Sequence, residues 1–271
     1  MMWTKPKTQK LNSTMYRVFF TPIKMSEQLL GILNGRKPSI IAFDCDWTLY
    51  PYDCDKDRIA PFQKTAYGLV DVWGQWSEPY PDVPHIMGAI LDAGIPVAFL
   101  SRNPSADAVE HLLRTIPLYS ATRGILSLWD SMPNRDYFHA YSARSAGGYG
   151  KGKDRHFAAL RAATGVHPNH ILFFDDMKDN IDAAAAQGTT SVLLGKPGLT
   201  WPAFIGGIAG WREQLEKIEA AEAAAEEHVH NGTAERGPQE EGRQGEGEAR
   251  AEPLQPEARS LSGGLGGEAR V

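Results

Sequence analysis

The stretch "SIIAFDCDWT" (residues 39–48) joins an apolar run directly to two carboxylates. A short, continuous apolar run such as residues 39–43 is typical of a strand that is covered on both faces. Asp44 and Asp46 lie two positions apart, so their side chains point to the same face where this strand ends. No Lys or Arg is adjacent to either carboxylate, and like charges held close together in a partly dry site repel strongly. We therefore expect a cation at this place, and Mg²⁺, which prefers oxygen ligands, is the natural candidate.

Three further apolar runs have the composition of buried strands: "IPVAFL" (95–100), "HILFF" (170–174) and "SVLLG" (191–195). They alternate with helical patterns over residues 82–94, 104–116, 153–165 and 178–188. Alternation of strand and helix implies right-handed crossover connections. The predicted fold class is therefore α/β, an open, mostly parallel sheet with helices on both faces. In such sheets, ligands bind beyond the carboxyl ends of the strands.

Polar residues follow each of these strands at that end. Ser101 and Arg102 follow the second run, and Asp175 and Asp176 follow the third. Lys153 opens the helical pattern that precedes the third strand. Two acids at the end of a buried strand need a charged partner or a metal. Together these segments supply what is needed to bind a phosphate group beside Mg²⁺.

Taken alone, each of these motifs can have an ordinary structural role instead of a catalytic one. A D-x-D-x-T loop is often simply solvated, a Ser often ends a strand, and a single Lys is usually an exposed charge. A calcium loop can be excluded, because "DCDKDRIAPFQK" (53–64) has Arg58 where that loop needs Gly and Lys64 where it needs Glu. The order of the elements, each at the proper strand end, is what makes the combination specific.

The motifs in this order resemble those of the haloacid dehalogenase superfamily of phosphohydrolases. The phrases "AFDCDWTLYPYDCD", "VAFLSRN" and "ILFFDDMKDNI" resemble more closely its magnesium-dependent phosphatase-1 (acid phosphatase-like) branch. The resemblance covers residues 39–195 and departs from the branch at Tyr50, where a Trp is usual, and at Leu100, where an Ala is usual. The stretch from 121 to 153 is longer than is usual and contains both Lys151 and Lys153. We favour Lys153, since "KDRHFAAL" opens a helix as in the family.

The resemblance implies covalent catalysis by a carboxylate. Asp44 would be the nucleophile that forms an aspartyl-phosphate, and Asp46 would be the general acid and base. Mg²⁺ would be held by Asp44, the backbone carbonyl of Asp46, and Asp176, with Asp175 as the alternative acidic ligand. The groups expected to bind the phosphoryl group are Ser101, Lys153, Arg102 and the backbone N–H groups of Cys45 and Asp46. Thr48 would stabilise the loop.

The site is expected to have a minimal cap or none, because only about thirty residues separate Thr48 from Pro79. Aromatic residues nearby would form either a flat rim for a phosphotyrosine ring or a sugar, or ordinary packing: Trp47, Tyr50, Tyr52, Trp73 and Trp76. The expected partner is a phosphorylated small molecule or a phosphoprotein substrate. The alternatives are a dedicated small-metabolite phosphatase and a non-catalytic phosphate or phosphopeptide binder, although a binder has no need of Asp46.

Composition sets the expected domain organisation. Residues 1–37 are predicted to be a poorly ordered extension, 38–210 the phosphatase domain, 211–230 a C-terminal helix, and 231–271 a disordered tail rich in Gly, Glu and Arg. A net charge of −5 without a basic stripe argues against nucleic acid. No apolar segment approaches the roughly 20 residues of a membrane span. The two cysteines indicate no disulfide framework, so we expect a cytoplasmic location, with the basic first 26 residues leaving a weaker mitochondrial alternative. The oligomeric state is left open.

Overall fold

A computed structural model describes residues 22–58, 60–65, 68–141 and 152–234. Lys151, the first 21 residues and the chain beyond residue 234 lie outside the described residues. The predictions of a disordered tail and of a targeting segment therefore remain predictions, apart from the few of their residues that fall in described helices.

The core of the fold is a five-stranded parallel sheet with the strand order β7-β4-β1-β8-β9. Its strands are β1 (Ile40–Phe43), β4 (Val97–Ser101), β7 (Phe138–Ala140), β8 (Ile171–Asp175) and β9 (Thr190–Leu193). Phe43 of β1 pairs with Phe99 of β4 and with Phe174 of β8, so the three strands end at one edge of the sheet. The predicted open parallel sheet is confirmed, and β7 adds an edge strand that the apolar runs did not indicate.

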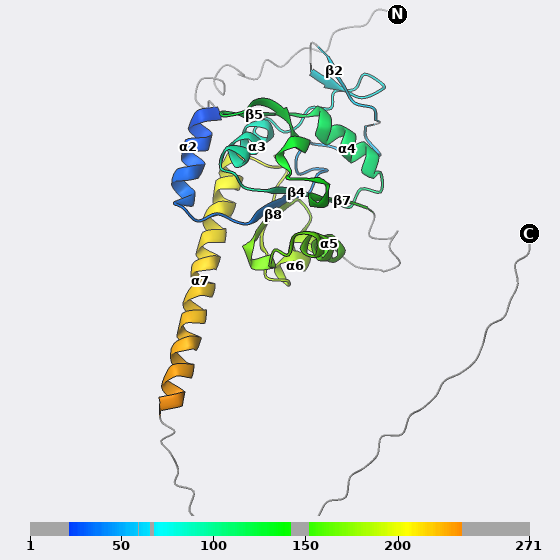
Figure 1. The fold of residues 1–271 in the computed structure, drawn as a ribbon. Helices are drawn as coiled ribbons and strands as arrows, with labels where there is room; N and C mark the ends of the chain where they lie inside the picture. The colour runs from blue at the N-terminus through cyan, green and yellow to red at the C-terminus, as the bar shows by residue number, and fades with distance from the viewer. Residues whose placement is uncertain (1–21, 59, 66–67, 142–151, 235–271) are drawn as a thin grey trace, which may run out of the picture. The chain divides into compact units, whose positions relative to one another are not determined.

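Helices cover both faces of this sheet (Figure 1). One apolar cluster joins alternate strand residues to α2 (Pro22–Leu33), α3 (Val83–Asp92), α4 (Ala106–Thr115) and the first part of α7 (Trp201–Ala234). The other cluster joins the opposite strand residues to α5 (Asp154–Thr164) and α6 (Lys178–Ala185). Strands that are buried on both faces explain why their sequences are continuously apolar.

Two antiparallel pairs and three short 3-10 helices complete the described elements. The pairs are β2 (Gln63–Thr65) with β3 (Gly68–Val70), and β5 (Pro117–Ser120) with β6 (Gly124–Ser127). The 3-10 helices are η1 (Leu128–Ser131), η2 (Arg135–Tyr137) and η3 (Pro168–His170). Of the residues described between Thr48 and Pro79, only the β2–β3 hairpin forms named strands, which agrees with the expectation of a minimal cap.

The chain before the sheet differs from the expected poorly ordered extension over residues 22–33, which form α2. Met25, Leu29 and Leu33 recur every four residues, so they share one face of the helix, and all three are buried. Burying a Leu or Met side chain stabilises a fold by about 1.5–3 kcal/mol. The basic composition of the first 26 residues concealed this apolar face.

Helix α7 begins at Trp201 rather than at residue 211, so the predicted helix boundary is wrong. The sequence "FIGGIAG" (204–210) contains three Gly residues, which are poor helix formers. Packing requires one of them: a Cβ added at Gly207 would lie 2.6 Å from the ring of Phe174. Close approach of the helix to the sheet therefore outweighs the low helix propensity.

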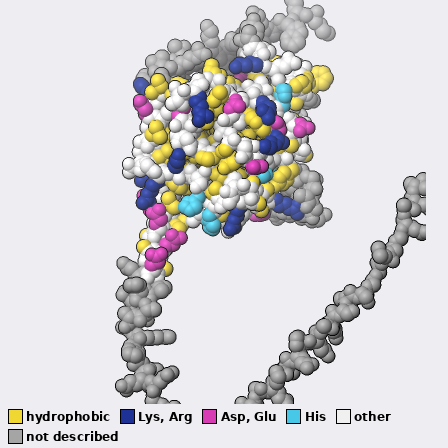
Figure 2. Space-filling view, in the orientation of Figure 1, with side chains coloured by type: hydrophobic (Ala, Val, Ile, Leu, Met, Phe, Trp, Pro, Cys, Tyr) yellow, Lys and Arg dark blue, Asp and Glu magenta, His cyan; other side chains and the backbone are white. Residues whose placement is uncertain are grey.

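The surface has two features that bear on partners. On the face shown in Figure 2, Lys and Arg side chains are scattered among acidic and apolar ones and form no basic stripe over the described residues. Within the described part of the chain, no helix is both long and apolar enough to cross a membrane.

Candidate active site

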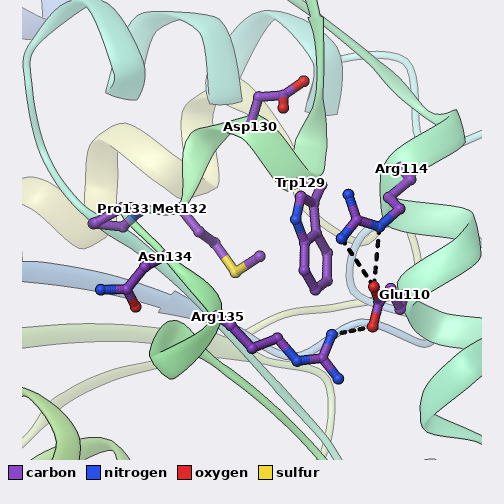
Figure 3. A pocket seen from close by; sticks show the side chains of 8 residues that line it. All are labelled: Glu110, Arg114, Trp129, Asp130, Met132, Pro133, Asn134 and Arg135. Atoms are coloured by element: carbon purple, nitrogen blue, oxygen red, sulfur yellow. Dashed lines mark hydrogen bonds and ion pairs between the residues drawn. The ribbon is translucent and has the colours of Figure 1, made fainter.

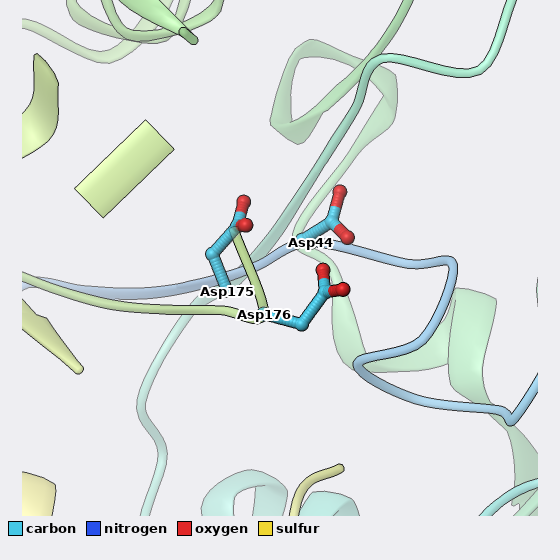
Figure 4. Close-up of side chains that lie close together, drawn as sticks. All are labelled: Asp44, Asp175 and Asp176. Carbon is cyan, nitrogen blue, oxygen red and sulfur yellow. The ribbon is translucent and has the colours of Figure 1, made fainter. Parts of the chain in front are cut away.

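Three carboxylates meet at the carboxyl edge of the sheet, from Asp44 after β1 and from Asp175 and Asp176 at the end of β8 (Figure 4). Each offers an oxygen, and these oxygens all lie within 4.8 Å of one another. The parallel pairing of β1 with β8 explains the convergence, because it places residues 43 and 174 side by side. We call this group the carboxylate cluster.

Lys153 is the cation that neighbours the carboxylate cluster. It is the N-cap residue of α5, its side chain is fully buried, and its Nζ pairs with Oδ1 of Asp44. The same Nζ lies 3.1 Å from Oδ2 of Asp175 and donates to the carbonyl oxygen of Leu100. Burial works against its charge, but the two carboxylates outweigh it and raise the pKa of Lys153, so the ammonium form persists.

One ammonium does not balance three carboxylates. Burial raises the pKa of Asp44 well above its usual value, Lys153 opposes this, and the charge of Asp175 adds to it. Burial, followed by the charge of Asp175, raises the pKa of Asp176 to about 6. Hard oxygen ligands with surplus negative charge fit Mg²⁺. Because a proton competes for the same oxygen, we expect metal affinity to fall as the pH drops toward 6.

The two acids at the end of β8 have different surroundings. Asp175 is buried, and its oxygens accept two hydrogen bonds of 2.9 Å from Nδ2 of Asn180 and one of 2.7 Å from the N–H of Met177. Asp176 is half-buried and accepts no hydrogen bond from another side chain in the described structure. The geometry therefore favours Asp176 as the acid that is free to bind a metal directly.

Arg102 lies at the same edge but contacts another residue. Its Nη1 donates to Oδ1 of Asn180 at 3.1 Å. Through Asn180 it supports Asp175, an arrangement that the sequence did not predict. Its predicted contact with a phosphoryl group remains a prediction.

Asp46 stands apart from the carboxylate cluster and is held by different partners. Its Oδ1 accepts from the N–H of Cys54 at 3.3 Å, and its Oδ2 accepts from Nδ2 of Asn103 at 2.7 Å. Burial raises the pKa of Asp46, and the hydrogen bond from Asn103 opposes this rise. The two carboxylates of the D-x-D motif thus have distinct environments, as a division between nucleophile and proton donor requires.

The backbone reverses directly after Asp46. Trp47 has φ +59°, in the left-handed region, and the N–H groups of Thr48 and Leu49 then donate to the carbonyl oxygen of Cys45. This turn returns the chain over the end of β1. The hydroxyl of Thr48 has no hydrogen-bond partner in the described structure, whereas its backbone carbonyl accepts from the N–H of Leu199. The loop is therefore held by backbone bonds rather than by the threonine hydroxyl.

Ser101 ends β4 and is 1% exposed. Its Oγ accepts from the N–H of Asn103 at 3.1 Å, and its carbonyl oxygen is 2.8 Å from Nε2 of His156. The strand pairing brings it to the same edge as Asp44, although its role in phosphate binding remains a prediction, as do those of the Cys45 and Asp46 N–H groups.

The aromatic side chains divide into two groups. Tyr50 and Tyr52 are buried and stack with ring centroids 4.7 Å apart, so they are packing residues and not part of a rim. Trp47, Trp73 and Trp76 are exposed. Of the five aromatic residues considered for a rim, these three remain available to contact a substrate.

The carboxylate cluster does not line either of two cavities found in the described structure. A cavity of about 580 Å³ surrounds Trp129, where Glu110 bridges Arg114 and Arg135 (Figure 3). A second, of about 930 Å³, is lined by proline and aromatic residues near the starts of α3 and α7.

Two important residues were not assigned a role from the sequence, Asn103 and His156. Both contact the end of β4, and Asn103 follows Ser101 by two positions. Asn103 comes one residue after the "SR" pair that was predicted to lie at the site, and this position could have marked it as a site residue. Nothing local marked His156, since its contact depends on how α5 packs against β4.

A parallel α/β sheet whose first strand ends in D-x-D-x-T, with an acidic pair after β8, defines a phosphatase of the haloacid dehalogenase type. Residues 36–214 match the family model described as acid phosphatase, and the chain belongs to that family. The expected resemblance is thereby confirmed.

Curated relatives of this chain carry the names of phosphatases, among them the following two. Human "Magnesium-dependent phosphatase 1" is 29% identical over 159 residues, which cover 58% of this chain and 78% of that protein. "Enolase-phosphatase E1" of Leptospira biflexa is 24% identical over 210 residues, covering 73% and 76% of the two chains. Among solved structures, a Had-superfamily hydrolase from Ehrlichia chaffeensis covers 66% of this chain and 98% of its own, with 11% identity and a TM-score of 0.42.

Proposed function

We propose that this phosphatase hydrolyses phosphomonoesters through an aspartyl-phosphate formed on Asp44. The observation that carries the proposal is the position of the Asp44 carboxylate, which lies within the carboxylate cluster and against the ammonium of Lys153. An anionic nucleophile can approach an anionic phosphate only where positive charge offsets the repulsion. Lys153 supplies one such charge, and Mg²⁺ held by the carboxylate cluster would supply the remainder.

In the first half of the reaction, an oxygen of Asp44 attacks phosphorus and the bond from phosphorus to the leaving oxygen breaks. Asp46 gives its proton to that leaving oxygen. Lys153 and Ser101 bind the transferring phosphoryl group. The leaving alcohol departs neutral, and the phosphate remains on Asp44.

In the second half, Asp46 acts as a general base, because it gave up its proton to the leaving group in the first half. It takes a proton from a water molecule, whose oxygen attacks phosphorus, and the bond to Asp44 breaks. The products are inorganic phosphate and a free Asp44 carboxylate, and Asp46 is protonated again. The separate hydrogen bonds of Asp46 support this role, because they leave it outside the carboxylate cluster.

Mg²⁺ would be held by the side chains of Asp44 and Asp176, with the backbone carbonyl of Asp46 as the further expected ligand. When bound, it supplies charge neutralisation of the phosphate and of the nucleophile. Asp175 orients Lys153 and is itself held by Asn180.

The substrate class that we favour is a phosphotyrosine or a sugar phosphate, received in an open site beside the exposed indoles of Trp47, Trp73 and Trp76. A dedicated small-metabolite phosphatase is the second candidate, favoured by the similarity to a protein named Enolase-phosphatase E1. The presence of Asp46 argues against a binder without catalysis. We propose the cytoplasm as the location.

Replacing Asp46 with Asn tests the mechanism. With p-nitrophenyl phosphate, whose leaving group needs little protonation, the intermediate should still form and then persist for want of a base. Mass spectrometry of the quenched protein should show one added phosphoryl group on the peptide that contains Asp44. An adduct on Ser101 or on a His would contradict the aspartyl-phosphate mechanism. Full turnover of the Asp46→Asn variant without any adduct would contradict it too.

Replacing Asp176 with Ala should weaken Mg²⁺ binding by at least about 10–100-fold and abolish turnover at ordinary metal concentrations, because a direct ligand is lost. High Mg²⁺ should restore part of the activity. Isothermal titration of Mg²⁺ measures the affinity. Asp179→Ala is the matched control, since Asp179 is an exposed acid on α6 outside the carboxylate cluster. A normal titration with Asp176→Ala would assign the ligand role to Asp175.

A further inference from the structure

We propose that Asn103 is a positioning residue that holds the carboxylate of Asp46 in the orientation needed for proton transfer. This inference rests on the proposed function, since it assigns Asp46 the role of acid and base. Asn103 follows β4, whereas Asp46 follows β1, and the two are joined by the 2.7 Å bond from Nδ2 to Oδ2. Asn103 is 5% exposed, so little water is available to replace this bond.

The orientation of the Asn103 amide is determined by its other contacts. Its Oδ1 accepts from the N–H of Ser105 at 2.8 Å. Reversing the amide would place an N–H₂ group against that N–H and a carbonyl oxygen against the carboxylate of Asp46. The backbone N–H of Asn103 also donates to Oγ of Ser101. The side chain is therefore fixed at both ends and presents its donors to Asp46.

The loop after the motif completes the arrangement. Nδ2 of Asn103 lies 3.2 Å from Oδ1 of Asp53 and 3.2 Å from Oδ1 of Asp55. Nδ2 also lies 3.4 Å from Sγ of Cys54. An amide has only two N–H donors, and the contact with Asp46 is the shortest of the four. The N–H of Cys54 reaches the other oxygen of Asp46 at 3.3 Å. Both oxygens of Asp46 are thus held, one from the end of β4 and one from the loop.

This geometry couples two functions across neighbouring strands. Ser101, which is predicted to bind the phosphoryl group, and Asn103 belong to one short segment that is braced by their own hydrogen bond. The segment therefore sets the position of the proton donor relative to the phosphate. Without Asn103, Asp46 keeps only the 3.3 Å hydrogen bond from the N–H of Cys54, so its carboxylate is less firmly oriented.

Asn103→Ala tests the proposal through its dependence on the leaving group. With p-nitrophenyl phosphate, formation of the intermediate should remain fast and its hydrolysis slow, so stopped-flow measurements should show a burst of nitrophenolate near one equivalent. With glycerol 2-phosphate, both steps need Asp46, and kcat/KM should fall at least about tenfold further than for p-nitrophenyl phosphate. Because slow hydrolysis of the intermediate also lowers the apparent KM for p-nitrophenyl phosphate, the quantities that should change little are the KM for glycerol 2-phosphate and the Mg²⁺ affinity.

Ser105→Ala is the matched control, because its hydroxyl makes no cap hydrogen bond and its backbone N–H is retained. An Asn103→Ala protein that still gives the burst has an intact nucleophile and an intact fold. An equal loss of kcat/KM for both substrates without a burst would overturn the role of Asn103. No loss of kcat/KM for either substrate would overturn it as well. The adduct on Asp46→Asn is measured separately, so a failure of the aspartyl-phosphate mechanism can be distinguished from a failure of this inference.

Discussion

Asp44→Asn should lower kcat by about 10⁴-fold or more while the protein stays folded, because a neutral amide is a poor nucleophile toward phosphorus. The amide is close in size to the carboxylate, so packing at the end of β1 is preserved. Burial already raises the pKa of Asp44, which shows that its charge is costly at this position. Removing the charge should therefore leave the melting temperature within a few degrees of wild type, since Lys153 keeps Asp175 as its partner. Steady-state kinetics and circular dichroism measure the two effects.

Asp107→Asn is the control for this substitution, since Asp107 is an exposed acid in the first turn of α4 and lies outside the carboxylate cluster. It should retain wild-type turnover. Retention of wild-type turnover by Asp44→Asn would contradict the covalent mechanism. A direct attack by water on the phosphate would then be the better description.

Lys153→Met should lower kcat by at least roughly 10²–10³-fold and destabilise the metal-free protein by about 3–5 kcal/mol, as expected when one partner of a buried ion pair is removed. Asp44 and Asp175 would be left as buried acids without their ammonium partner. Loss of one preorganised donor to a transition state typically costs roughly 10²–10³ in kcat, and the hydrogen bond to the carbonyl of Leu100 is lost too. Thermal unfolding without Mg²⁺ measures the stability.

Added Mg²⁺ should raise the melting temperature of Lys153→Met more than that of the wild type, because the metal supplies the missing positive charge. Lys178→Met is the matched control: Lys178 is 72% exposed and pairs with Asp182 on the surface of α6. Its stability should change by less than about 0.5 kcal/mol. A Lys153→Met protein as stable as this control would show that the buried ion pair contributes nothing to the fold.

Much of the fold followed from local patterns. The continuous apolar runs predicted β1, β4, β8 and β9, because strands buried on both faces have no polar face. The same patterns predicted which polar residues would stand at the carboxyl ends of those strands, and the convergence of Asp44 with Asp176 followed from parallel pairing. Helix α2 and the start of α7 were not predicted, because their apolar faces are interrupted by basic residues or glycine and gain their stability from packing.

Local sequence was sufficient to predict most strands of the sheet and the acidic residues that gather at its carboxyl edge. The partners of those residues depend on tertiary packing. Lys153 and Asp44 are separated by 109 positions, and Asn103 and Asp46 by 57, so no local pattern indicates either contact. The structure also distinguishes Asp175, whose oxygens accept hydrogen bonds from Asn180, from Asp176, which is free to bind a metal. The physical reason is that alternation along a strand sets which way a side chain points, whereas its partner depends on which strands and helices pack beside it.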